Sequence, residues 1–138
     1  MRTFLVAITA LAAGFLLAAD TPKENAEKKL KELHKERIGT LQQIADLYKA
    51  QIANGFVTRE DIMQAKLLLL KAELDASNTD HERIIIQQTI VEMMTEFEEM
   101  TSQVVMHSHV DRTVYLKAKA ERLKAEIDLE RAKSGNSK

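Results

Sequence analysis

The sequence predicts an all-α fold built from two tandem antiparallel helical hairpins that pack up-down-up-down, as in a coiled coil. Beyond residue 19, apolar residues recur at steps of three and four, which is the period of a helix with one buried face. Helix-start and helix-stop signals divide this pattern into four segments. No segment alternates apolar and polar residues between turn signals, as a half-buried strand would. Only four aromatic residues follow position 19, so the core has to be built from small and aliphatic side chains.

The first nineteen residues form a segment of their own. Fifteen of them are apolar, Arg2 supplies a positive start, and the small residues Ala18 and Ala19 precede Asp20, as at a signal-peptidase site. The apolar run is shorter than the roughly 20 residues that span a bilayer. We therefore expect residues 1–19 to be a cleaved signal peptide and the rest, which shows no later membrane span, to be periplasmic or secreted. The absence of Cys excludes lipid attachment at a lipobox and any disulfide.

The first predicted hairpin occupies residues 22–77. Pro22 suits a first helical position, and the helix it begins continues to Gly55, which can adopt the left-handed conformation that ends a helix. Thr58, with Asp61 three residues later, forms a capping box for a second helix. Ser77 and the asparagine after it break that helix.

The second predicted hairpin occupies residues 79–133, followed by a disordered tail at 135–138. Thr79 and Glu82 repeat the start signal. The third helix carries a coiled-coil seam, and its members are Ile86, Ile90, Met93, Phe97, Met100 and Val104. The fourth helix, about 112–133, carries two stripes: Leu116, Ala120, Leu123 and Ile127 on one, and Ala118, Ala125 and Ala132 on the other. Alanines spaced by seven allow helices to approach closely.

The two hairpins are an internal duplication. Sliding the chain by 53 residues leaves nine of the nineteen positions 57–75 identical, including the string Leu-Lys-Ala-Glu at 70 and 123. The Glu-Arg-Ile strings at 36 and 82 are instead offset by 46. The first helix of each hairpin, which we call the ascending helix, therefore differs in length by one heptad between the two hairpins. A difference of seven residues keeps the same face of the helix inward. An up-down-up-down order places the turns at 54–57 and 107–110 at one end of the domain.

Residues 48–66, with the sequence YKAQIANGFVTREDIMQAK, resemble the periplasmic hairpin of TolC-like outer-membrane efflux proteins. The positions that fit the family pattern are Gly55, Phe56, Val57, Asp61, Ile62, Ala65 and Lys66. In that family the turn is the tip of a helical tunnel and meets a periplasmic adaptor. The resemblance implies a TolC periplasmic-domain-like fold, outer-membrane association, and a partner-binding tip at Gly55, Phe56, Val57 and Asp61. The partner would be an adaptor or a second copy, and three copies would supply the twelve helices of a TolC-like tunnel, which makes a homotrimer conceivable.

The chain departs from the family in two respects. Its second tip has Ser108, His109 and Val114 where the pattern has glycine, an apolar residue and aspartate. Family members are several times longer and contain barrel strands, whereas this sequence has no alternating ten-residue segments. The chain alone therefore cannot be a complete efflux channel.

No catalytic signature is present. The sequence has no nucleophile constellation, Gly-rich phosphate loop or His-Glu-x-x-His pair, so we expect neither an enzyme nor a cofactor. A net charge of −1 argues against a nucleic-acid partner. Glu96, Glu98 and Glu99 are interpreted as a solvated helix face, because neighbouring residues diverge around the axis.

Met106, His107 and His109 at the second tip are candidate ligands for a soft metal ion, together with methionines at 93, 94 and 100. The competing interpretation is that these methionines fill gaps in the helix packing and that the histidines are solvated. A site with two His and one Met falls short of the usual three or four placed donors.

Two questions remain open from sequence alone. The first tip either exposes Phe56 and Val57 for docking or packs Phe56 across the turn as an ordinary connection. The leading functional hypothesis is a non-catalytic, TolC-like interaction module of the envelope, associated with an efflux system. The alternative is a periplasmic stress or metal-responsive protein similar to Spy and CpxP, although the Leu-Thr-x-x-Gln motif of that family is missing.

Overall fold

The computed structural model describes residues 22–107 and 111–135 and contains four α-helices and no strand within them. They are α1 (Pro22–Gln51), α2 (Arg59–Ala76), α3 (Asp80–His107) and α4 (Arg112–Lys133), with a short 3-10 turn, Ile52–Asn54, after α1. The predicted all-α class and the four helices are confirmed. The expected signal peptide at 1–19 lies outside the described residues, as does most of the predicted tail, of which only Gly135 is described.

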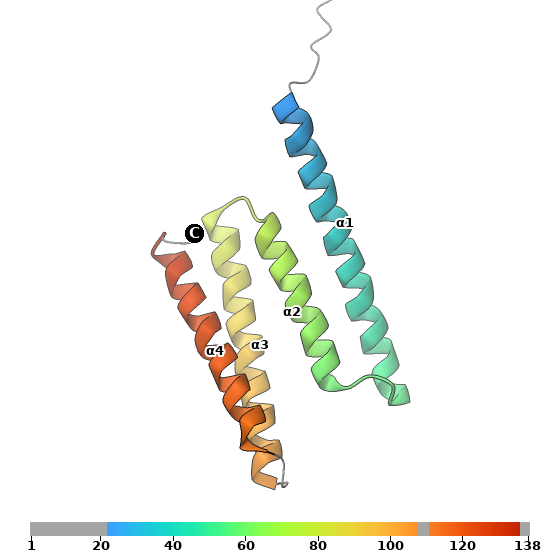
Figure 1. Ribbon diagram of the computed structural model, residues 1–138, viewed down its shortest axis with the longest axis vertical. Helices are drawn as coiled ribbons and strands as arrows, with labels where there is room; N and C mark the ends of the chain where they lie inside the picture. Colours follow the sequence, from blue (N-terminus) through green and yellow to red (C-terminus); the bar gives the residue numbers. More distant parts are fainter. Residues whose placement is uncertain (1–21, 108–110, 136–138) are drawn as a thin grey trace, which may run out of the picture.

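The helices stand side by side in chain order (Figure 1). The closely packed pairs are α1 with α2, α2 with α3, and α3 with α4, so that α1 and α4 form the two outer edges. The turn after α1 and the end of α3 lie at one end of the molecule, and the α2–α3 turn lies at the other. This is the predicted up-down-up-down arrangement of two hairpins. None of the helices that the structure describes combines the length and apolar character of a membrane-spanning segment.

Small residues bring the helices together. The most deeply buried residues of α2 and α4 are alanines that repeat at intervals of seven, as the sequence predicts, because a side chain of one carbon lets two backbones approach. They are Ala65 and Ala72 on α2, and Ala118, Ala125 and Ala132 on α4. The other α4 stripe is exposed, with Leu116, Leu123 and Ile127 directed away from the packed face. The fold therefore selects the alanine stripe of α4 as its inner face.

The predicted seam of α3 is partly wrong. Ile90 is buried as expected, but Met94 and Thr101 are the other buried residues, and Val104 is about half exposed. The reason is that α3 packs against both α2 and α4, so one stripe cannot serve both contacts. Thr101 is tolerated inside because its hydroxyl donates to the main-chain oxygens of Phe97 and Glu98, each at 2.9 Å.

The two ascending helices, α1 and α3, are in register with each other at the end of the molecule that carries the α2–α3 turn. Arg37 of α1 forms a 2.7 Å ion pair with Asp75, and Arg83 of α3 donates to the main-chain oxygen of Leu74 and to the Ser77 hydroxyl, both at 3.3 Å. Both arginines thus reach the same end of α2. Since they belong to the Glu-Arg-Ile strings offset by 46, the alignment agrees with the one-heptad difference predicted between these helices.

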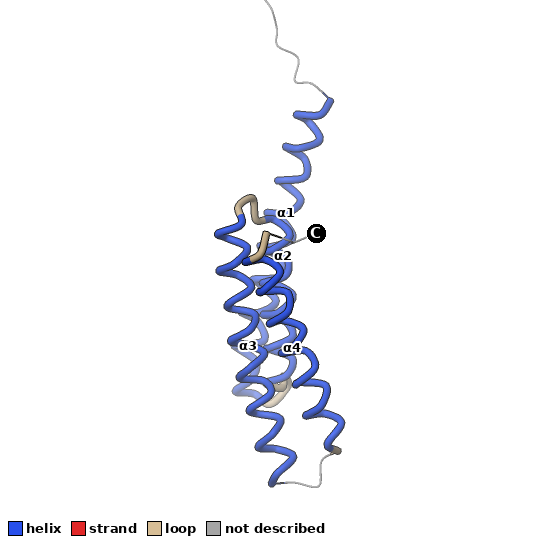
Figure 2. Tube along the Cα trace, turned by 90° about the vertical axis from the view of Figure 1, so that its left-hand side faces the viewer, coloured by secondary structure: helices blue, strands red, loops and turns tan. Residues whose placement is uncertain are grey.

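Helix α1 is much longer than its partner. Figures 1 and 2 show its first turns projecting beyond the α2–α3 turn, and Leu30 and Leu33 in this part are exposed. A groove forms where α1 leaves the end of α2, lined by Leu30, His34, Ile38 and residues 75–78.

Candidate functional site

The first tip is a tightly specified turn. Gly55 has φ +73°, a left-handed conformation that side chains with a Cβ rarely adopt, and its N–H donates to the Ile52 main-chain oxygen at 3.1 Å. No atom would crowd a Cβ at this position, so the glycine is required by the backbone angle alone. The helix therefore stops where the sequence predicts.

A complete capping box starts α2 immediately after the turn. The Thr58 N–H donates to the Asp61 carboxylate at 2.9 Å, the Thr58 hydroxyl donates to it at 2.7 Å, and the Asp61 N–H donates to the Thr58 hydroxyl at 3.1 Å. The hydroxyl bond, followed by the main-chain bond, lowers the pKa of Asp61. Asp61 thus holds the turn together, and its carboxylate is engaged within the tip.

The structure separates the two apolar residues of the tip. Phe56 is 84% exposed, whereas Val57 is buried. Phe56 therefore does not pack across the turn as an ordinary connection would require, and the expectation that Val57 is exposed beside it is wrong. Val57 precedes the helix cap, where an apolar residue can anchor the entry of the chain into the helix.

The tip therefore presents one aromatic ring on a rigid support. Exposure of a phenylalanine leaves apolar area in water that burial would remove at roughly 25 cal/mol per Å². Aromatic rings are large, rigid anchors at protein interfaces because few torsions are fixed when they bind. Chemically, this arrangement can insert a ring into an apolar pocket of a partner.

The candidate metal ligands are brought together only in part. Met106 and His107 end α3, and both are exposed, whereas His109 lies outside the described residues. Met94 is buried in the apolar cluster with Leu67 and Ile90, and Met93 packs against it. Within the residues that the structure describes, no group of three or more His, Asp or Glu side chains is arranged to hold a metal ion.

The second tip closes with a different cap. Asp111, which corresponds to Thr58 in the 53-residue frame, accepts hydrogen bonds from the Thr113 N–H at 3.0 Å and the Thr113 hydroxyl at 2.8 Å. The main-chain bond, followed by the hydroxyl bond, lowers the pKa of Asp111. This cap is not among the predicted helix starts, although an aspartate immediately before a helical pattern is a recognised start signal. Since Val114 occupies the position of Asp61, the second tip cannot form the reciprocal box of the first.

A second overlooked feature joins α3 to α4. Arg122 donates to Glu98 across the two helices and to Glu126 on its own helix at 2.6 Å, and the side chains of Arg122 and Glu98 are mostly buried. The hydrogen bond from Arg122 lowers the pKa of Glu98, and the same bond raises the pKa of Arg122. The interpretation of Glu98 as solvated is wrong, while Glu96 and Glu99 are exposed as expected. The Glu98–Arg122 ion pair links α3 to α4 and so stabilises the second hairpin.

Comparison of the chain with models of protein families, with curated proteins and with solved structures found no match.

Proposed function

We propose that this protein is a non-catalytic interaction module of the cell envelope, which docks a partner protein through the Gly55–Phe56 tip of its first hairpin. The observation that carries the proposal is the 84% exposure of Phe56 on a turn that is held by the Gly55–Ile52 hydrogen bond on one side and by the Thr58–Asp61 capping box on the other. The turn would form equally well with a polar residue at position 56. A ring held in water by a rigid support is the arrangement expected of an interface anchor.

The resemblance of residues 48–66 to the TolC-like hairpin supports the compartment and the kind of partner in this proposal. It favours an adaptor-like partner in the periplasm and an association with an efflux system. The first tip is the stronger candidate of the two, because Gly55, Phe56, Val57 and Asp61 all fit the family pattern. Of these residues, Phe56 is exposed, Val57 is buried and Asp61 is hydrogen-bonded to Thr58. Phe56 is therefore the residue that we propose to contact the partner. The signal-peptide pattern at 1–19 is consistent with the same compartment.

The proposal is tested by placing a photo-crosslinking amino acid at position 56 in the native host. Crosslinking should join the protein to one distinct partner, and Phe56→Asp should abolish co-purification of that partner while the far-UV helical signal is unchanged. The matched controls are a crosslinker at Leu68 and Leu68→Asp, because Leu68 is an exposed apolar residue on the body of α2. Retention of the partner by Phe56→Asp, or equal crosslinking from both positions, would refute the proposal.

A further inference from the structure

Asn54 is the residue of the first tip whose side chain the turn does not use. It ends the 3-10 turn that follows α1, and both Asn54 and Gly55 are exposed. Within the described part of the chain, the Asn54 amide has no hydrogen-bond partner, whereas Gly55 and Thr58 hold the turn through main-chain and capping bonds. The fold therefore gives no reason for an asparagine at position 54.

The pairing of Asn54 with Gly55 places an amide carbon next to a main-chain nitrogen that no side chain shields. The side-chain carbon Cγ of Asn54 and the nitrogen of Gly55 can close a five-membered ring, and a Cβ on the following residue would hinder that approach. Glycine has no Cβ, and no atom lies within 4 Å of where one would stand at position 55. Asn-Gly occurs nowhere else in the sequence, and the 53-residue frame has His107 and Ser108 at the equivalent positions.

Ring closure requires the Gly55 N–H to leave the Ile52 main-chain oxygen, to which it donates at 3.1 Å. This bond belongs to a three-residue 3-10 turn, whose hydrogen-bond geometry is poorer than that of an α-helix. An exposed helix end of this kind opens at a much lower free energy than the whole domain. The Thr58–Asp61 box on the other side of the tip can stay closed during such an opening, because it involves none of these atoms.

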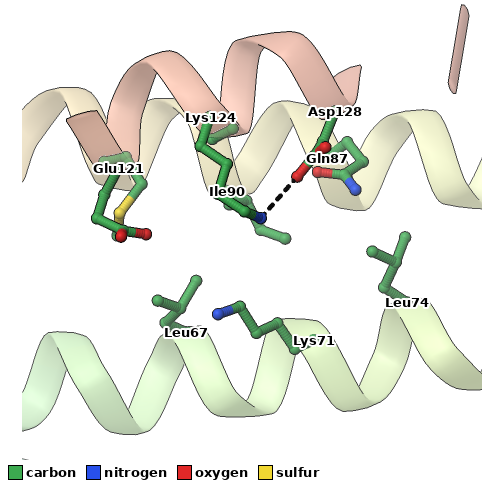
Figure 3. Close-up of a pocket in the computed structure, with 10 residues that line it drawn as sticks. Leu67, Lys71, Leu74, Gln87, Ile90, Glu121, Lys124 and Asp128 are labelled. Carbon is green, nitrogen blue, oxygen red and sulfur yellow. Dashed lines mark hydrogen bonds and ion pairs between the residues drawn. The ribbon is translucent and has the colours of Figure 1, made fainter. Parts of the chain in front are cut away.

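The helical core does not have to open either. Figure 3 shows Leu67 directed from α2 toward the helix that carries Ile90, and both belong to the apolar cluster that also contains Met94 and Ala125. None of the residues 52–55 is part of that cluster. The turn can therefore open while the four helices remain packed.

We propose that Asn54 is a self-modification site, where the folded protein converts its own side-chain amide to a carboxylate with water as the only co-reactant. The Gly55 nitrogen gives up its proton to water and bonds to Cγ of Asn54, and the amide nitrogen takes up a proton and leaves as ammonia. Water then opens the cyclic imide. Cleavage of the new bond from nitrogen to Cγ gives aspartate, and cleavage of the original peptide bond gives isoaspartate, so no oxidant or reductant is involved.

Both products alter the tip beside Phe56. Each places a negative charge at the carboxyl end of the first helix, where the main-chain carbonyls make a negative charge unfavourable. Isoaspartate also adds one carbon atom to the main chain directly before Gly55, which displaces the turn and the ring that follows it. A loss of docking by this route rests on the proposed function of the tip, whereas the modification itself does not.

The test is peptide mapping of the full chain by mass spectrometry after the folded protein is kept at neutral and at mildly alkaline pH. The internal control is Asn78, which is exposed but precedes Thr79, a β-branched residue whose N–H donates to Glu82 at 3.3 Å. Asn54 should lose its amide at least about tenfold faster than Asn78, a barrier difference of about 1.4 kcal/mol. The rate should rise with pH, because the attacking nitrogen loses its proton, and both aspartate and isoaspartate should form.

Three results would overturn the proposal: equal rates at Asn54 and Asn78, aspartate formed without isoaspartate, or a reaction at Asn54 that needs urea. The last would assign the chemistry to the unfolded chain. These masses are measured on the purified protein without a partner, so the outcome is separate from that of the docking proposal.

The effect on docking is measured with the crosslinker at position 56. Ageing should lower the crosslinking yield in proportion to the fraction of Asn54 converted. The matched control is Asn54→Gln, because glutamine would have to close a larger ring, and its yield should not change on ageing. An equal fall in both proteins would refute the link between the modification and docking.

Discussion

Replacing Ala72 by leucine tests whether the alanine stripe determines how closely the helices pack. Ala72 is 0% exposed and lies one heptad from the buried Ala65 on the inner side of α2. Leucine adds three carbon atoms where no space is open to solvent, so the backbones have to separate or the side chain has to adopt a strained rotamer. Overpacking of this kind costs roughly 1 to 3 kcal/mol.

For a domain of about this size, each kcal/mol lowers the melting temperature by roughly 4 to 8 °C. We therefore expect Ala72→Leu to melt roughly 4 to 24 °C below the wild type when thermal unfolding is followed by far-UV circular dichroism. The matched control is Ala50→Leu, the same substitution at an exposed position of α1, which should change stability by less than about 0.5 kcal/mol. If Ala72→Leu and Ala50→Leu melt at the same temperature, the alanine stripe does not set the packing distance.

Three further predictions concern the tip and the ion pair. Val57→Ala should lower the free energy of urea unfolding by about 1 to 2 kcal/mol because Val57 is buried, whereas Phe56→Ala should change it by less than about 0.5 kcal/mol; equal losses would contradict the separation of these residues. Thr58→Ala removes the capping box and should cost about 1 kcal/mol in the same assay, and an unchanged midpoint would show that the box contributes nothing. Hydrogen bonds from Thr58 and Arg122 hold the pKa of Asp61 and of Glu98 below the ordinary 3.8 and 4.5. Because the folded-state pKa is the lower one, this stabilisation is complete above those values and is lost as the pH falls through the folded-state pKa. Urea midpoints should therefore decline below about pH 4.5, and Glu98→Gln should make the decline shallower; an identical decline in that variant would contradict the role of Glu98.

The helix boundaries were predictable because their signals are local. Gly55 ends one helix through its own backbone angle, and the Thr58 and Thr79 boxes are each contained within four residues. The duplication was likewise visible as repeated letters, and it fixed the order and direction of the helices. These features depend on no contact between distant parts of the chain.

What could not be predicted was the choice among competing faces. The sequence of α4 shows two stripes, and only the packing with α3 selects the one that contains Ala118 and Ala125. The pairing of Glu98 with Arg122 depends on the register of α3 against α4, which neither helix encodes alone. At the tip, periodicity does not distinguish the exposed Phe56 from the buried Val57, because both lie in a turn outside the helical pattern.

The alignment of α1 and α3 at the far end of α2 has a consequence for any partner. Counted from Arg37 in α1 and Arg83 in α3, which lie at the same level, α3 is one heptad longer than α1 together with its 3-10 turn. At 1.5 Å per residue, the end of α3 therefore lies roughly 10 Å beyond the Phe56 turn. Figures 1 and 2 show this stagger, with the end of α3 projecting past the α1–α2 turn. A flat surface approaching along the helices would meet the second hairpin first and stop short of the ring. A partner that receives Phe56 therefore needs a stepped profile, or a projection narrow enough to pass beside the longer hairpin.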